Sequence, residues 1–248
     1  MAGRSGICGR RFKCRGSGHI NQKVPVVETA GRDPKEYIPA LKEAGIKTVH
    51  KVPAVRFALK AQAAGVDAVT LVGFECGGHP GMDDVGSFVL IPSAAKALDI
   101  PIIAGGGVCD GRSYLAARCL GAEAVVIGTR FIATKECVIH PAFKEALLAA
   151  DERSSLMVQR SIRNANRVMK NEASQKLYEM ERTGKPTLEE VLTIANGKKQ
   201  KECYENGNTN GGLFPLGQCA GQINEVISVK EVIDNIIAEA ERVYNSLA

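Results

Sequence analysis

Short apolar runs alternate with amphipathic segments along the first half of the chain. The runs read as strands buried on both faces, at residues 24–30, 47–52, 68–73, 101–107 and 124–131. Segments with helical spacing of apolar residues separate these strands, at 33–45, 55–65, 88–98 and 112–121. Four successive crossovers of this length predict a parallel sheet with helices packed against it.

The second half of the chain loses this alternation and is predicted to be mainly helical. Helices are expected at 141–152, 155–181, 187–195 and 228–247. Ser228 and Glu231 have the spacing of a capping box at the start of the last helix. Residues 207–222 are too rich in Gly and Asn for regular structure and are expected to form a loop.

The number of strands bears directly on the architecture. A closed barrel needs eight βα units, whereas this pattern supplies five strands by Phe131, which would leave two open sheet edges. We therefore predict an α/β fold of the (β/α)8 TIM-barrel type, apparently lacking the first strands, with a mostly helical C-terminal part. The expected domains are a disordered basic segment at 1–22, a βα-barrel portion at 23–136, and a helical part at 137–248 packing on the barrel.

Composition narrows the classes of protein that fit. The chain has 248 residues, 45% of them hydrophobic, which is ample for a sizeable core. Its 8 cysteines are scattered without a C-x-x-C pair, which favours free thiols in a reducing compartment over disulfides or a zinc site. We expect no metal site. No apolar run approaches a membrane span and no apolar signal segment is visible, so a cytoplasmic location is expected.

The charge is concentrated at one end of the chain. The net charge is +5, and residues 1–23 contain six basic residues and no acidic one, so the remainder is near neutral. A nucleic-acid-binding role would rest on this basic segment alone. Mitochondrial targeting by the Arg-rich N-terminus is the alternative to a cytoplasmic location.

Candidate chemistry centres on the stretch Val69–Gly81, where a strand ends in a glycine-dense turn that carries His79. Gly77, Gly78 and Gly81 would let the backbone take positive φ and approach a ligand closely. Such loops lie at the carboxyl ends of parallel strands, where α/β proteins bind ligands. A tight turn with an exposed histidine is the plain structural alternative.

Glycine clusters also end the next two strands. Gly105–Gly107 and Gly128 occur at a spacing of one βα unit, so their turns should lie side by side on the carboxyl rim. Backbone N–H groups there, with a helix N-terminus, can bind a phosphate; steric relief in the turns is the alternative reading. No G-x-G-x-x-G follows a strand and no Walker sequence occurs, which argues against a Rossmann or P-loop site.

These motifs together resemble the nitronate monooxygenases, formerly called 2-nitropropane dioxygenases. The resemblance runs from about Val24 to the C-terminus and is carried by GFECGGHPG, DDVGSFVLIP, IPIIAGGGVCDGRSYLAARCLGAEAVVIGTRFIATKE and GQCAGQI. The family consists of FMN-dependent TIM barrels related to the flavin-type enoyl-ACP reductases. The resemblance implies that His79 is the active-site residue above the flavin. It implies a cofactor-binding set of Lys51, Gly77, Gly106, Gly107, Val126, Ile127, Gly128 and Thr129.

Some positions depart from the family pattern. Val72 falls where many members carry Gln, and Lys51 also fits an ordinary exposed strand-end lysine. Relatives open with strands that bear further flavin contacts, and residues 1–23 contain nothing similar. The chain is therefore expected to match barrel strands four to eight. Asp83, Asp84 and Arg130 are expected to form salt bridges at the rim of the barrel.

The function implied by the resemblance is FMN-dependent oxidation of alkyl nitronates, such as propionate 3-nitronate, by O₂ to a carbonyl compound and nitrite. His79 would orient the nitronate or act as a base toward the nitroalkane. The partners expected are this small molecule and O₂, with no nucleic acid and no membrane; a homo-oligomer is compatible with the sequence.

Three other functions stay open. An enoyl-ACP reductase using NAD(P)H is disfavoured because Met82–Val85 replaces the Glu-Thr-Thr usual in such reductases. An inactive, truncated barrel would neither close nor hold FMN. A nucleic-acid binder lacks aromatic platforms and a reading motif.

Overall fold

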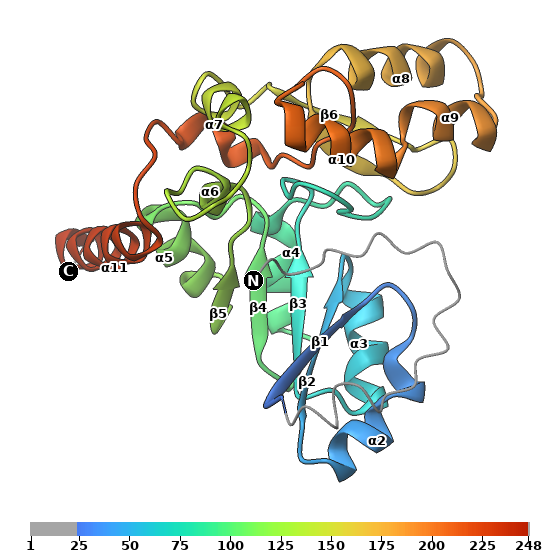
Figure 1. Ribbon diagram of the computed structural model, residues 1–248. Coiled ribbons are helices and arrows are strands. Elements are labelled where there is room, and N and C mark those ends of the chain that lie inside the picture. The colour runs from blue at the N-terminus through green and yellow to red at the C-terminus, as the bar shows by residue number, and fades with distance from the viewer. Residues whose placement is uncertain (1–23, 248) are drawn as a thin grey trace.

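A parallel sheet forms the first part of the molecule. The computed structural model describes residues 24–247, so the segment predicted at 1–22 lies outside the described residues. The strands follow the order β1-β2-β3-β4-β5 (Figure 1). Their bounds are β1 Val26–Ala30, β2 Lys47–Val52, β3 Ala68–Val72, β4 Ile102–Gly105 and β5 Ala124–Val126. Every pair is parallel, as predicted, and within residues 24–247 no further strand pairs with β1 or β5.

Helices connect these strands and cover one face of the sheet. They are η1 Pro34–Glu36, α2 Ile38–Glu43, α3 Val55–Ala64, α4 Ser87–Ala95 and α5 Gly111–Cys119. Val69 and Leu71 of β3 are fully buried against this layer, together with Ile91 of α4. The predicted single helix at 33–45 is instead broken at Tyr37 into η1 and α2.

Alternate residues point to the opposite face of the sheet. The register pairs Lys51 with Thr70, and Val72 with Gly105, so these residues share that face. A polar network crosses it, because the Glu28 carboxylate accepts a hydrogen bond from Thr70 Oγ1 at 2.8 Å and one from Lys51 Nζ at 2.7 Å. The side chains at the carboxyl end of this face line the site described below.

Most of the C-terminal part lies across the carboxyl ends of the strands, but its last helix, Val229–Leu247, packs against α5 (Figure 1). Its elements are α6 Thr129–Ile132, α7 Pro141–Leu148, β6 Ser155–Val158, β7 Asn166–Met169, α8 Glu172–Thr183, α9 Leu188–Ile194, α10 Gly197–Asn206, η2 Gln218–Gln222 and α11 Val229–Leu247. Phe143, Tyr204 and Phe214 form an aromatic cluster at its centre, with ring centroids 4.7–5.0 Å apart. No helix of residues 24–247 has the length and apolar character needed to cross a bilayer.

The predicted helix at 155–181 is wrong in its first half. An antiparallel hairpin of β6 and β7 occupies this region, and α8 begins only at Glu172. Asn171 fixes that start, because its side chain accepts a hydrogen bond from Ser174 N at 2.8 Å in a capping box. The segment forms strands because Val158 and Val168 are fully buried and β7 makes backbone contacts with distant loops.

Two smaller differences from the predictions concern β5 and α10. The predicted strand at 124–131 ends at Val126, since Phe131 N donates to Gly128 O and turns the chain into α6. Helix α10 was not predicted, because its polar sequence shows little apolar periodicity. The capping box before α11 is confirmed: Ser228 N and Oγ donate to Glu231 Oε2, and Glu231 N donates to Ser228 Oγ.

Candidate functional site

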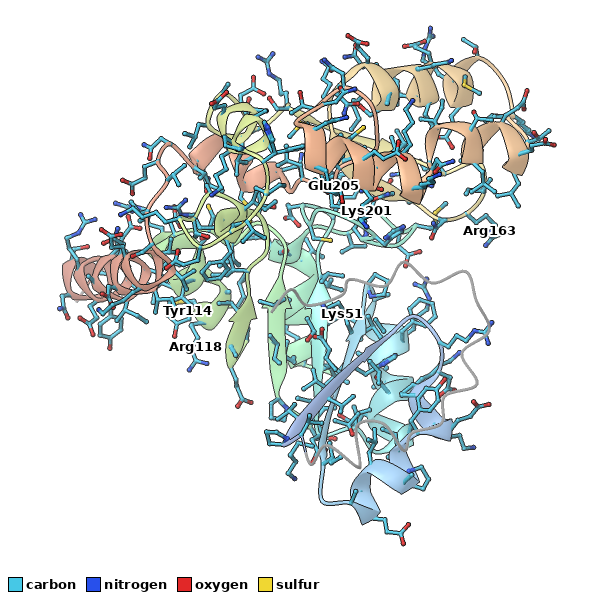
Figure 2. All side chains as sticks on the ribbon, viewed as in Figure 1. Lys51, Tyr114, Arg118, Arg163, Lys201 and Glu205 are labelled. Carbon is cyan, nitrogen blue, oxygen red and sulfur yellow. The ribbon has the colours of Figure 1, made fainter. Side chains whose placement is uncertain are left out.

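A large cavity lies at the carboxyl ends of the strands, between the sheet and the C-terminal part. Its volume is about 1180 Å³, above the usual range of small-molecule sites, roughly 300–1,000 Å³. Every predicted site residue lines it: Lys51, Gly77, His79, Gly106, Gly107, Val126, Ile127, Gly128 and Thr129. Figure 2 shows Lys51 at the end of β2 that faces the C-terminal part. The sequence prediction therefore converges on a single region.

Close backbone packing shapes the turn that carries His79. Gly78 and Gly81 adopt φ values of +87° and +85°, as expected. Gly77 does not take positive φ. A Cβ there would lie 2.8 Å from Gly217 N and 2.9 Å from the Leu216 backbone. Glycine is needed at 77 because two backbone segments meet there.

Glu75 holds the same turn from the other side. Its carboxylate accepts hydrogen bonds from Ser87 N at 2.9 and 3.0 Å and from Ser87 Oγ at 3.0 Å, which caps the first turn of α4. Ser87 Oγ also lies 3.1 Å from Gly106 O. One carboxylate thus connects the His79 turn, α4 and the glycine turn after β4.

Arg167 of β7 fixes the turn from the C-terminal part. Its backbone exchanges two hydrogen bonds with Gly78, at 2.6 and 2.9 Å. Its guanidinium donates to Phe74 O at 2.9 Å and lies 4.4 Å above the Phe74 ring. The residue is 3% exposed, and within residues 24–247 its Nη2 has no hydrogen-bond partner. Distant parts of the chain therefore define where His79 lies.

The imidazole of His79 is available for chemistry. It makes no hydrogen bond or ion pair with the residues from 24 to 247. The side chain is exposed to the cavity, yet the surrounding protein atoms partly desolvate the ring and lower its pKa. His79 is therefore neutral near pH 7, able to accept a proton or to donate one N–H.

Cys76, three residues earlier, lines the same cavity. Burial raises the pKa of its thiol to about 11. A neutral thiol is a poor nucleophile, so the His79 turn does not provide a cysteine–histidine pair for covalent catalysis.

The two glycine turns at β4 and β5 offer a cradle of backbone donors. Gly106 and Gly107 have φ values of +91° and +80°, and a Cβ at Gly128 would meet no atom within 4 Å. Among the described residues, the N–H groups of Gly107, Gly128 and Thr129 have no hydrogen-bond partner. These unpaired donors and this open space fit the phosphate group of a flavin mononucleotide. The expected help from a helix N-terminus is small, since α6 has 4 residues.

Predicted ion pairs at the rim are confirmed. Asp83 pairs with Arg56 at 2.6 Å, and Asp84 pairs with Arg160 at 2.6 Å. Arg130 is buried and lies 4.0 Å from the Glu225 carboxylate. These contacts give the three residues structural roles at the edge of the barrel portion.

Several residues and contacts that shape the site could not be predicted from the sequence. Arg167 lay in a region interpreted as helix, and the role of Glu75 required knowledge of where α4 begins. Thr129 Oγ1 accepts a hydrogen bond from Gly217 N at 3.0 Å, a contact across 88 residues of sequence. The Gly-rich loop at 207–222 was the one sequence feature that indicated such a contact, because glycines in a loop allow another segment of backbone to approach closely.

Comparisons with known proteins agree with this geometry. A family model described as nitronate monooxygenase matches residues 8–239. A structure of FabK from Thermotoga maritima is 37% identical, with a TM-score of 0.85, over 92% of this chain and 72% of that one. A relative from Mycobacterium tuberculosis is 30% identical over 89% of this chain and 72% of its own length. Its name is (3aS,4S,5R,7aS)-5-hydroxy-7a-methyl-1-oxo-octahydro-1H-indene-4-carboxyl-CoA dehydrogenase.

A probable nitronate monooxygenase from Bacillus subtilis is 32% identical over 83% of this chain and 61% of its own length. The chain's five parallel strands and connecting helices correspond to the barrel fold of such relatives. The matched region includes the sheet, the His79 turn and both glycine turns. The chain therefore belongs to the nitronate monooxygenase family, a family of oxidoreductases that are generally FMN-dependent.

Proposed function

We propose that this protein binds FMN in the cavity and oxidises alkyl nitronates of the propionate 3-nitronate type with O₂. The products would be nitrite and a carbonyl compound. The observation that carries the proposal is the joint placement, around one cavity, of a neutral imidazole and three backbone donors that have no partner among residues 24–247. Family membership supports the same reaction class.

The glycine turns would hold the cofactor. The N–H groups of Gly107, Gly128 and Thr129 donate to the phosphate, and the absent Cβ atoms leave room for its oxygens. Val126 and Ile127 give apolar surface next to this cradle. When bound, FMN supplies the electron transfer between nitronate and O₂.

His79 would position the substrate. A neutral imidazole that has no partner in the described part of the chain can donate one N–H to a nitronate oxygen. For a neutral nitroalkane, the same ring accepts the α-proton on its unprotonated nitrogen. Glu75 and Arg167 hold the turn, so that the ring is oriented before substrate binds.

Nitrite release tests the proposal. FMN-loaded protein should release nitrite from propionate 3-nitronate, and His79→Ala should lower kcat/KM by about 100-fold, the lower end for losing a positioned acid–base group. His140→Ala is the matched control, because His140 caps α7 and does not line the cavity. Equal activity of wild type and His79→Ala would remove His79 from the mechanism, and no nitrite from wild type would refute the reaction.

A reductase acting on a thioester is the second candidate. Its support is the similarity to FabK and to a dehydrogenase of a carboxyl-CoA compound. The sequence Met82–Val85 after the His79 turn weighs against it. NAD(P)H oxidation with crotonyl-CoA, in the absence of nitronate, distinguishes this candidate from the first.

A further inference from the structure

The cavity extends well beyond the glycine cradle. The cradle lies at the β4–β5 end, while the β1–β2 end is lined by Phe57 and Lys60 of α3, by Met82, and by Arg163. Figure 2 shows Arg163 at the edge of the C-terminal part, below α9, on the same side of the view as α3 and away from β5. The phosphate-binding donors do not account for this second end.

Two cations at the β1–β2 end have no acidic partner. Among residues 24–247, neither the Lys60 ammonium nor the Arg163 guanidinium forms an ion pair or hydrogen bond. Lys51, by contrast, is neutralised by Glu28 at 2.7 Å. Asp33 is the one carboxylate among the described lining residues, and the two cations outnumber it; its Oδ1 accepts a hydrogen bond from Lys35 N at the start of η1. This end of the cavity is therefore suited to an anion.

Apolar side chains beside these cations add a second property that a ligand of this end must match. Phe57 is 38% exposed and Met82 is 41% exposed, although both are large and hydrophobic. Together with the cations, they match a ligand that joins an apolar segment to a negatively charged group.

The backbone that carries Arg163 is held in place. Of the described residues other than glycine, Asp84, Gln159 and Arg163 have positive φ, at 56°, 62° and 56°. Arg160 links two of these segments through its 2.6 Å ion pair with Asp84, and Asn166 Nδ2 donates to Gln159 Oε1 at 3.0 Å. Strained conformations of this kind persist where their surroundings hold them, and they cluster at ligand clamps.

We propose that the β1–β2 end of the cavity is a binding subsite for an oxyanion, a carboxylate or phosphate that the substrate carries on an apolar segment. Lys60 and Arg163 bind the oxyanion, and Phe57 and Met82 contact the apolar segment. The subsite deepens the proposed function, on which it rests for the chemistry at His79. A short nitronate with its own carboxylate and a phosphate-bearing thioester such as coenzyme A present the same chemistry to it.

Two nitronates that differ only in the charged group test the carboxylate source. Propionate 3-nitronate and propyl-1-nitronate have equal chain length, but the second carries a methyl group instead of the carboxylate. Lys60→Gln and Arg163→Gln should each raise KM for propionate 3-nitronate about tenfold and leave KM for propyl-1-nitronate unchanged. Lys96→Gln is the matched control, since Lys96 is exposed, forms no ion pair with residues 24–247 and does not line the cavity.

Binding of coenzyme A tests whether the oxyanion is a phosphate, and this measurement does not depend on enzyme activity. Calorimetric titration of the FMN-loaded protein should show binding that each of the two variants weakens about tenfold. The subsite is supported if the variants differ from wild type either in KM for propionate 3-nitronate or in affinity for coenzyme A. Unchanged KM for propionate 3-nitronate, together with absent or unaltered coenzyme A binding, overturns it. If wild type releases no nitrite, the proposed function fails and the titration alone decides on the subsite.

Discussion

A substitution at Gly128 can test the proposed FMN site without disturbing the fold. The φ of −115° at Gly128 is accessible to any residue, and a Cβ there would meet no atom of the described residues within 4 Å. The position nevertheless lines the cavity beside the unpaired N–H groups of Gly107 and Thr129. Gly128→Val therefore adds bulk next to the N–H groups that are expected to bind the phosphate of FMN.

The size of the effect follows from the donors involved. A hydrogen bond to a charged group contributes about 1.5–3 kcal/mol. Displacing the phosphate from one of the three donors should raise the Kd for FMN by a factor of roughly 10 to 150, since about 1.4 kcal/mol corresponds to tenfold. The free energy of unfolding of the FMN-free protein should change by less than about 0.5 kcal/mol, because no contact is lost or strained.

Fluorescence quenching of FMN on titration with protein measures the Kd, and urea unfolding of the FMN-free protein measures stability. Gly197→Val is the matched control, because its Cβ would also meet open space, at the start of α10 and outside the cavity. It should leave the Kd unchanged. An unaltered FMN affinity in Gly128→Val would refute the assignment of the cradle to the phosphate.

Three further predictions concern the His79 turn. Gly77→Ala should cost about 1–3 kcal/mol of unfolding free energy in urea, because its Cβ would meet the backbone of Gly217 at 2.8 Å; an unchanged midpoint would contradict this packing. Glu75→Ala should cost about 1 kcal/mol by removing the cap on Ser87 N, whereas Glu75→Gln, which keeps an acceptor, should lose less; equal losses would argue against capping. Because burial lowers the pKa of His79 below its ordinary value of about 6.5, the unfolded chain binds more protons there. Its contribution to stability is therefore complete above about pH 6.5 and is lost as pH falls through the lowered pKa, and His79→Gln should flatten that part of a pH series of urea unfolding curves.

The parallel sheet could be predicted because its signals are local. Strands buried on both faces give uninterrupted apolar runs, and β2 and α3 begin at the predicted residues Lys47 and Val55. The glycine turns and His79 were found for the same reason, since each closes a strand whose position the pattern defines. Placing all of them around one cavity then follows from the geometry of parallel strands.

The hairpin of β6 and β7 could not be predicted, because its stability comes from distant partners. Arg167 pairs with Gly78, and Val168 pairs with Pro215, contacts that no local pattern reveals. A polar, Arg-rich segment such as 159–167 has no clear period of either kind, so the burial of Arg167 depends on tertiary structure.

The most direct test of the account is FMN binding by the unaltered chain. Purified protein should be incubated with excess FMN and separated from free flavin by gel filtration, and the visible absorption of the protein peak recorded. The account predicts that about one FMN per chain co-elutes with folded protein. Folded protein that emerges without flavin absorption would contradict the central claim that the cavity between the sheet and the C-terminal part is an FMN site.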